Sequence, residues 1–398
     1  MAAHHPRWSE LPQELLTNIA KKLETRFQTL QFRAVCKSWR SSVLLPPLTL
    51  TQPKLPYPFF LKYEGNPTGF TTLKQFTYYT IRRRQLTHKP ELQHFARISS
   101  GKVGVIVFSE DKPNRMYFKD PLSENWLSRK TYLKTLHLSE VEISGFYKYY
   151  ELCTIDSSTG EEITSFHDLR KLVLNSRNDS IHDFVIMAIH YPKTLVSVRS
   201  GDKMWTVIGN EKGEFRDVIL YKGRFYAVDR MGRTWIVDSR TFEMTLVANS
   251  IKNAWQDKYL LESNEKLFLV DVRLDRFCYH DLNCEDCFPL PKECKVFMLD
   301  EKEKQWIKVK SLGDAMFLLS MDHSCSISAL DFPGCRGNSI LFSEYNHQNN
   351  TECGAVKWIA LTADRIRDLV MSSYEIPNDI SPFQLALGYG LVDGSNAA

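Results

Sequence analysis

The sequence lacks the long apolar segments of a membrane protein and the N-terminal signal of a secreted one. Its longest strongly apolar stretch, Phe184 to Ile189, is far shorter than the ~18 residues that a membrane helix needs. The start, Met1 to Arg7, has no apolar core of a secretory signal peptide. Nine cysteines without such a signal are typical of reduced thiols and not of a disulfide framework. We therefore expect an intracellular protein, nuclear, cytoplasmic or both.

Excess charge is scarce, and the charge that exists lies at one end. Residues 1–45 hold seven Lys or Arg and three Glu, which leaves 44 basic and 44 acidic residues of the chain's 51 and 47. The long remainder therefore has no net field to attract DNA, RNA or an anionic membrane. The short basic segment is suited to an acidic protein partner, so we expect neither a nucleic acid nor a membrane as partner.

Catalytic motifs are missing as well. The sequence has no Walker loop, no Gly-x-Ser-x-Gly elbow and no His-Glu-x-x-His helix. Cys325 and Cys335, near His323, are the remaining candidates for a nucleophile. Lone cysteines of this kind are more often structural, so the favoured interpretation is a protein that is not an enzyme.

One cluster of soft ligands approaches a zinc motif. His280, Cys284, Cys287 and Cys294 follow one another at short spacing, and such ligands can close a tetrahedral site. However, there is one Cys-x2-Cys pair without a second, and Phe288 to Pro291 intervenes. A loop of free thiols is the favoured interpretation, and we expect no metal and no cofactor.

What the first 45 residues do have is helical periodicity. Apolar residues recur at every fourth position, with two more beside them: Leu11, Leu15, Ile19, Leu23, Leu16 and Ala20. This pattern predicts a helix over residues 12–23 with one buried face, starting at Ser9 or Leu11. Two shorter helices are predicted over 25–35 and 36–43. Three helices this short cannot bury a sizeable core alone, which indicates a docking module.

Residues 46–98 begin rich in proline and threonine, which is typical of a linker. Yet Pro58 to Leu61 and Phe76 to Ile81 are too apolar for a solvated tether. We therefore expect residues 46–98 to be a linker partly docked on the next domain.

From residue 99 onward, short β runs alternate with turn residues. Gly223 to Asp229 and Gly232 to Asp238 predict a hairpin, and Glu243 to Val247 supplies a third strand.

One sequence pattern recurs in this region. It consists of an apolar strand that ends in Asp, a turn, and a strand that begins with an aromatic residue. Asp238, Asp271 and Asp300 mark it about 30 residues apart. Such repeats are typical of propeller blades. We expect an all-β domain over 99–365, a β-propeller of kelch-like blades, followed by a closing segment and tail over 366–398. A β-sandwich is the alternative.

Residues 8–45 resemble an F-box. The resemblance is carried by Trp8-Ser9-Glu10-Leu11-Pro12-Gln13-Glu14-Leu15-Leu16 together with Phe32-Arg33-Ala34-Val35-Cys36-Lys37-Ser38-Trp39-Arg40. The pairing of the two stretches at this distance is what makes it specific, although residues 24–30 depart from the family's usual turn. F-boxes bind the Skp-type adaptor of SCF (Skp–cullin–F-box) ubiquitin ligases, and the adjoining domain selects the substrate.

The resemblance implies binding to a Skp-type adaptor (the plant ASK proteins) and through it to a cullin. The residues that match adaptor-packing positions are Leu11, Pro12, Leu15, Ile19, Leu23, Leu30, Val35, Cys36 and Trp39. Among these, we expect Pro12, Leu15 and Trp39 chiefly at the interface. For Leu16 and Ala20 the favoured interpretation is the module's own core.

Two clusters of basic residues can be interpreted either as functional or as ordinary solvated charges. Arg33, Lys37 and Arg40 either steer association with the partner or are solvated charges at the rim. Arg82-Arg83-Arg84 is long enough for a nuclear-import signal, but a solvated strand or turn is the favoured interpretation.

Three stretches of the downstream sequence carry a second resemblance. They are residues 221–229, 310–318 and 326–340, the third being the most distinctive. They resemble the plant F-box family whose C-terminal domain is called a KIB-type β-propeller. This implies a substrate-recognition adaptor of an SCF E3 ubiquitin ligase, with an unknown protein target held by unidentified propeller residues. The alternatives are a Skp-binding scaffold without ligase activity, or a lectin or enzyme propeller with a vestigial F-box.

Overall fold

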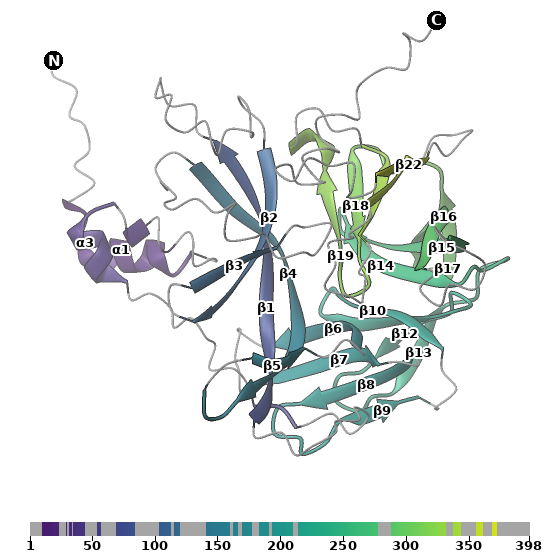
Figure 1. The fold of residues 1–398 in the computed structure, drawn as a ribbon, viewed down its shortest axis with the longest axis horizontal. Helices are drawn as coiled ribbons and strands as arrows, with labels where there is room; N and C mark the ends of the chain where they lie inside the picture. Colours follow the sequence, from purple (N-terminus) through teal and green to yellow (C-terminus); the bar gives the residue numbers. More distant parts are fainter. Residues whose placement is uncertain are drawn as a thin grey trace, which may run out of the picture.

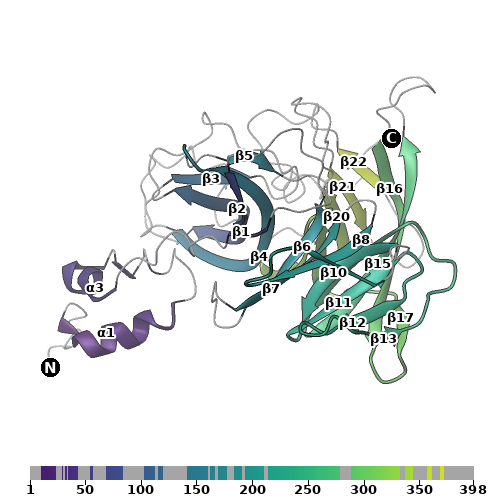
Figure 2. The same ribbon diagram turned by 90° about the horizontal axis from the view of Figure 1, so that it is seen from below.

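The chain folds into a small helical module and a set of sheets (Figure 1). The computed structural model describes residues 10–23, 29, 32–33, 35–43, 54–56, 69–83, 103–112, 115–119, 141–159, 162–165, 169–176, 183–190, 193–209, 214–277, 288–331, 337–343, 356–360 and 368–371. The helices α1 (Gln13–Ala20) and α3 (Lys37–Ser42) lie to one side of the sheets in both views (Figures 1 and 2). Most of the expected second helix is outside the described residues. Among the described residues, no helix is long and apolar enough to cross a membrane.

The strands form five sheets in the described part of the chain. The first sheet, in the order β3-β2-β1-β4-β5, comprises β1 (Gly69–Arg83), β2 (Val103–Lys112), β3 (Arg115–Lys119), β4 (Val141–Asp156) and β5 (Glu162–Ser165). The second comprises β6 (Leu169–Ser176), β7 (Phe184–His190), β8 (Thr194–Arg199) and β9 (Thr206–Ile208). The third comprises β10 (Phe215–Tyr221), β11 (Arg224–Asp229), β12 (Thr234–Val237) and β13 (Met244–Ala248). The fourth comprises β14 (Asp257–Ser263), β15 (Lys266–Phe277), β16 (Phe288–Asp300) and β17 (Gln305–Val309).

The fifth sheet is irregular. Its order is β19-β18-β20-β21-β22, from β18 (Ala315–Leu319), β19 (Ser324–Ser328), β20 (Ser339–Ser343), β21 (Val356–Ala360) and β22 (Asp368–Met371). The β18–β20 pair is parallel, whereas sheets two to four are antiparallel meanders in chain order, the pattern of a propeller blade.

The sheets are arranged around a centre, each facing the next. Strands β4, β6, β10, β14 and β19 contact one another in this order, and residues of all five line one central cavity. Apolar clusters join each sheet to its neighbour, through Leu152 with Ile186, Met187 with Phe225, Tyr226 with Leu269, and Val270 with Phe317. No sheet covers its own faces, so the core lies between sheets. The prediction of a β-propeller is confirmed.

The last sheet closes the ring on the first through a buried aromatic cluster. His323, directly before β19, is 2% exposed, and its ring stacks on Tyr149 of β4 with centroids 4.3 Å apart. Its Nε2 shares a hydrogen bond with the Tyr78 hydroxyl of β1, and its Nδ1 lies 2.7 Å from an Asp322 carboxylate oxygen. Side chains from the two ends of the domain therefore seal the ring.

The predicted hairpin is confirmed in strands β11, β12 and β13. Its turn requires glycine at one position. Gly232 has φ +83°, and a Cβ there would lie 2.9 Å from Cγ1 of the buried Ile251. A larger residue would meet both backbone strain and a clash.

The aspartate repeat, by contrast, mixes two structural roles. Asp238 and Asp300 each follow or end the third strand of a sheet and accept two backbone N–H bonds from the next turn, at 2.8 Å for Asp238 and at 3.0 and 3.1 Å for Asp300. Asp271 lies inside β15 instead, fully buried in an ion pair with Lys258. The three aspartates are therefore not structurally equivalent, and two of them, Asp271 and Asp300, belong to the same sheet.

Part of the expected linker belongs to the propeller. Strand β1, within residues 46–98, is the central strand of the first sheet, paired with β2 on one side and β4 on the other. Phe76 is fully buried, and Leu55 bridges to Thr71 of β1. The linker interpretation is wrong for residues 69–83, because their apolar run is a strand paired on both sides and not a docked tether.

Candidate functional site

The outward face of α1 is the first candidate site. Pro12 is the N-cap residue, with ψ of 144°, so the helix begins at Gln13 and not at Ser9 or Leu11. Leu15 and Ile19, one turn apart, are 49% and 39% exposed. Val35, before α3, is 52% exposed. Each Å² of such surface removed from water contributes about 25 cal/mol, so this face is suited to an apolar partner.

The inward face of α1 forms a very small core. Leu16 is fully buried, as expected, and Phe32 is nearly so. The Phe32 ring packs on Trp39 of α3 with centroids 4.5 Å apart. Trp39 is half-buried, which means that it braces the module as well as reaching its surface. Ala20 is also half-buried.

Two arginines connect the helical segments. Arg33 Nη1 donates to the carbonyl oxygens of Arg40, at 2.9 Å, and of Val43. Arg40 Nε donates in return to the Arg33 carbonyl at 3.2 Å. Carbonyls at a helix C-terminus have no partner within the helix, and Arg33 supplies one. These two side chains are therefore structural bridges, whereas Lys37 is exposed.

Four further residues that the resemblance assigns to the adaptor contact are at least partly exposed. Pro12 is exposed, and Leu11, Leu23 and Cys36 are half-buried. Cys36 is the N-cap residue of α3. Exposed and half-buried apolar groups thus extend from the start of α1 to the start of α3.

The centre of the propeller ring is the second candidate site. A cavity of about 570 Å³ lies there, within the roughly 300–1,000 Å³ of typical ligand pockets. Its lining comes from residues 146–150 of β4, 171–174 of β6, 219–220 of β10, 262–264 of and after β14, 314–315 and 322 around β18, and 324–328 of β19. Among the described strands, β5 pairs with β4 near its end, at residues 153–155, which leaves residues 146–150 as an inner edge.

A buried ion pair forms one wall of the cavity. Lys171 Nζ of β6 lies 2.9 Å from Asp217 Oδ1 of β10, and the two side chains are 5% and 2% exposed. Lys171 Nζ also donates to the Leu260 carbonyl of β14 at 3.3 Å, and the Leu260 N–H donates to Asp217 Oδ2 at 2.5 Å. The pair therefore ties three neighbouring sheets together.

Two titratable side chains at the cavity stay neutral. Burial raises the pKa of the Tyr147 hydroxyl well above its ordinary value, and burial raises the pKa of the Cys325 thiol to about 12. A thiol with this pKa is protonated at neutral pH and a poor nucleophile. The His323 ring is engaged in the ring-closing cluster. The geometry does not support Cys325 with His323 as a nucleophile and base.

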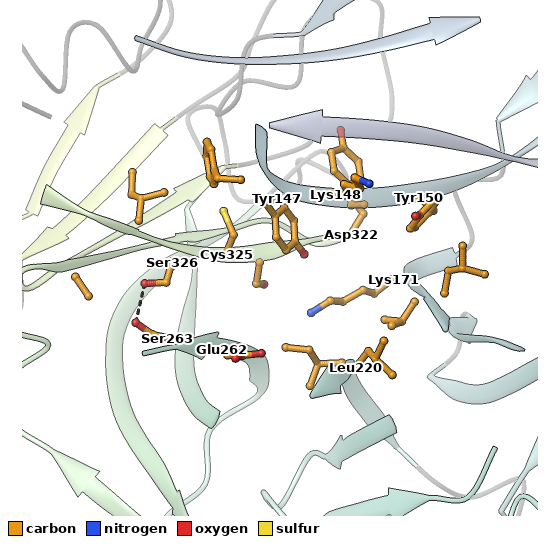
Figure 3. Close-up of a pocket in the computed structure, with 18 of the residues that line it drawn as sticks. Tyr147, Lys148, Tyr150, Lys171, Leu220, Glu262, Ser263, Asp322, Cys325 and Ser326 are labelled. Atoms are coloured by element: carbon orange, nitrogen blue, oxygen red, sulfur yellow. Dashed lines mark hydrogen bonds between the residues drawn. The ribbon is translucent and has the colours of Figure 1, made fainter. Parts of the chain in front are cut away.

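Polar groups of several kinds face the cavity. Figure 3 shows the Tyr147 hydroxyl, the Lys171 amine and the Glu262 carboxylate directed toward the same space. The Ser263 and Ser326 hydroxyls hydrogen-bond to each other at 2.8 Å across two strands. The cavity therefore offers both donors and acceptors.

Two of the stretches that carry the second resemblance, residues 310–318 and 326–340, meet at this cavity. A Cβ on Gly337 would lie 2.5 Å from the Cα of Asp314, so only glycine permits the contact. Asn338 Oδ1 accepts the Leu312 N–H at 2.7 Å. These contacts fix the turn that places Asp314 in the cavity wall. Residues 326–340 are the most distinctive stretch of the resemblance, but the sequence alone does not show that they lie at the central cavity.

Several residues of the predicted sites fall outside the part of the chain that the structure describes. Outside the described residues lie Leu30, Arg84, His280, Cys284, Cys287 and Cys335. Of their companions, Cys294 is buried in β16, and Arg82 and Arg83 end β1. Within the ranges that the structure describes, no group of three His, Cys, Asp or Glu side chains is placed to hold a metal ion.

Comparison with known proteins matches both parts of the chain. The model of the F-box domain matches residues 8–51, and that of the KIB1-4 beta-propeller matches residues 40–359. The F-box protein SKIP23 of Arabidopsis thaliana is 30% identical over 367 residues, covering 88% of this chain and 87% of that protein. The F-box protein At2g17036 of the same plant is 30% identical over 367 residues, covering 86% and 85%.

Among solved structures, the Cps50 (Swd1) beta-propeller domain of Myceliophteria thermophila has a TM-score of 0.32 and 14% identity, and covers 66% of this chain and 82% of that one. The two sequence models together span nearly all of the chain up to residue 359, and the plant relatives match over most of their own length. The chain therefore belongs to the family of F-box proteins with a KIB1-4 beta-propeller.

Proposed function

We propose that this protein is the substrate-recognition adaptor of an SCF ubiquitin ligase, acting in the nucleus or cytoplasm. Its F-box, residues 8–45, binds a Skp-type adaptor such as the plant ASK proteins and through it a cullin. Its propeller holds a target protein. The chain itself breaks no bond. It holds the target beside the conjugating enzyme, so that ubiquitin transfer becomes effectively intramolecular.

The exposed apolar face of α1 is the observation that carries this proposal. Leu15, Ile19 and Val35 are exposed, and among the described residues of this module the buried apolar side chains are Leu16 and Phe32. Aliphatic anchors at the centre of an interface supply much of its affinity. We assign the adaptor contact to Leu11, Pro12, Leu15, Ile19, Leu23, Leu30, Val35, Cys36 and Trp39.

Affinity purification tests the proposal. The tagged full chain is expressed in plant cells with and without a proteasome inhibitor, and bound proteins are quantified by mass spectrometry. We expect a Skp-type adaptor and a cullin to co-purify. We also expect at least one further bound protein to carry ubiquitin conjugates and to rise severalfold when the proteasome is blocked.

Two other results would contradict the proposal. Recovery of the Skp-type adaptor without a cullin, and with bound proteins unchanged under inhibition, would indicate a scaffold without ligase activity. Recovery of neither adaptor nor cullin would indicate a vestigial F-box and leave the propeller as the functional part.

A further inference from the structure

The central cavity carries more negative than positive charge. Glu262, Asp314 and Asp322 line it against Lys148 and Lys171. The Lys171 ammonium is already paired with a buried carboxylate of β10 at 2.9 Å, so it contributes little net charge. Inside a partly enclosed site, charges act through less solvent than at an open surface. The surplus of carboxylates therefore favours a cationic group and disfavours an anionic one.

Two of these carboxylates are available to a ligand. Glu262 and Asp314 are both exposed. Asp314 accepts a hydrogen bond from the Ser328 hydroxyl at 2.9 Å through Oδ2, which leaves its other oxygen for a further donor. Within the described part of the chain, the Glu262 carboxylate has no hydrogen bond or ion pair. Figure 3 shows this carboxylate directed into the cavity.

The remaining walls suit the apolar stem of a long basic side chain. Phe146 lines the cavity and is 37% exposed, and the Tyr147 and Tyr150 rings line the same cavity. Aromatic rings attract a cation that lies over their faces, and lysine or arginine stems pack along apolar surface. A volume of about 570 Å³ has room for one such side chain and the backbone on either side of it.

We propose that this cavity is the target-recognition pocket of the propeller and that it takes one arginine or lysine side chain from an extended segment of the target. The guanidinium or ammonium group pairs with Glu262 and Asp314, and its stem lies along Phe146 and Tyr150. The inference rests on the proposed function, because it names the chemistry by which the propeller holds its target.

Peptide pools test this pocket directly. The probes are fluorescently labelled short peptides, random except for a fixed central arginine, lysine, glutamine or glutamate. Binding to the purified full chain is measured by fluorescence anisotropy. We expect the arginine and lysine pools to bind at least about fivefold more tightly than the glutamine pool, and the glutamate pool to bind most weakly.

Matched variants assign the preference to the cavity. Glu262→Gln combined with Asp314→Asn keeps the shape and the acceptor for Ser328 but removes both charges, and should abolish the preference for basic pools. Glu301→Gln, which alters a carboxylate 52% exposed and paired with Lys222, should leave it intact. Equal binding of all pools, or tighter binding of the glutamate pool, would contradict the proposal that the cavity binds a basic side chain. A preference that survives the double substitution would contradict it as well.

Binding of a Skp-type adaptor, measured on the same samples, separates this inference from the proposed function. We expect wild type and both variants to bind the adaptor equally. A wild type that binds the adaptor but shows no preference among the pools overturns the pocket alone. A wild type that binds neither overturns both.

Discussion

Replacing Lys171 with methionine is expected to lower the free energy of unfolding by about 3–5 kcal/mol. The ammonium contacts Asp217 at 2.9 Å, where the carboxylate side chain is only 2% exposed. Without it, Asp217 keeps the N–H groups of Val218 and Leu260, at 2.7 and 2.5 Å, but no compensating charge. A buried carboxylate that loses its opposite charge carries a large desolvation cost. The Leu260 carbonyl loses a donor as well.

The matched control is the same substitution at Lys222, whose ion pair with Glu301 spans 3.7 Å with side chains 58% and 52% exposed. An exposed pair of this kind is screened by solvent and contributes little to stability, so the Lys222 variant should unfold close to wild type. Urea unfolding followed by fluorescence compares the two variants with wild type. A Lys171→Met variant within about 1 kcal/mol of wild type would show that the ion pair does not hold the sheets together.

Combining Leu15→Ala with Ile19→Ala should weaken binding to a Skp-type adaptor by about a thousandfold. Both side chains are exposed in the free chain, so their truncation leaves the module's interior intact and removes only what a partner would cover. Aliphatic anchors at an interface centre each contribute on the order of 2 kcal/mol, and about 1.4 kcal/mol corresponds to tenfold in affinity. Calorimetric titration of purified adaptor into the full chain measures the change.

The control is Asn18→Ala, an exposed substitution on the polar face of the same helix, which should leave affinity within a few fold. Trp39→Ala is a poorer probe, because Trp39 packs on Phe32 and its loss would disturb the module itself. If the Leu15 and Ile19 double variant bound the adaptor within about tenfold of wild type, the contact would lie elsewhere.

Features determined by local residues could be predicted from the sequence. The hairpin of β11 and β12 was readable from its alternating strands and its glycine turn, because a turn with φ +83° selects its own residue type. The face of α1 was readable from apolar spacing. Periodicity alone placed Leu15, Leu16 and Ile19 on one face, whereas Leu16 is fully buried and Leu15 and Ile19 are 49% and 39% exposed.

Contacts between segments far apart in the chain could not be predicted from the sequence. Strand β1 looked like a docked tether, because nothing nearby in the sequence reveals that it pairs with β2 and with β4 on either side. The aspartates of the repeat looked alike, although Asp271 is buried beside Lys258 while Asp238 closes an exposed turn. The cavity could not be predicted from the sequence, because the Lys171–Asp217 pair in its wall joins two strands of different sheets that meet only in the closed ring.

Hydrogen exchange with and without a Skp-type adaptor tests most directly whether α1 and α3 form a docking surface completed by another protein. The full chain is labelled alone and with saturating adaptor. We predict strong protection in residues 13–20 and 37–42, with the strands from β6 to β17 unchanged. Absence of binding, or protection confined to the propeller while α1 exchanges as before, would contradict the account.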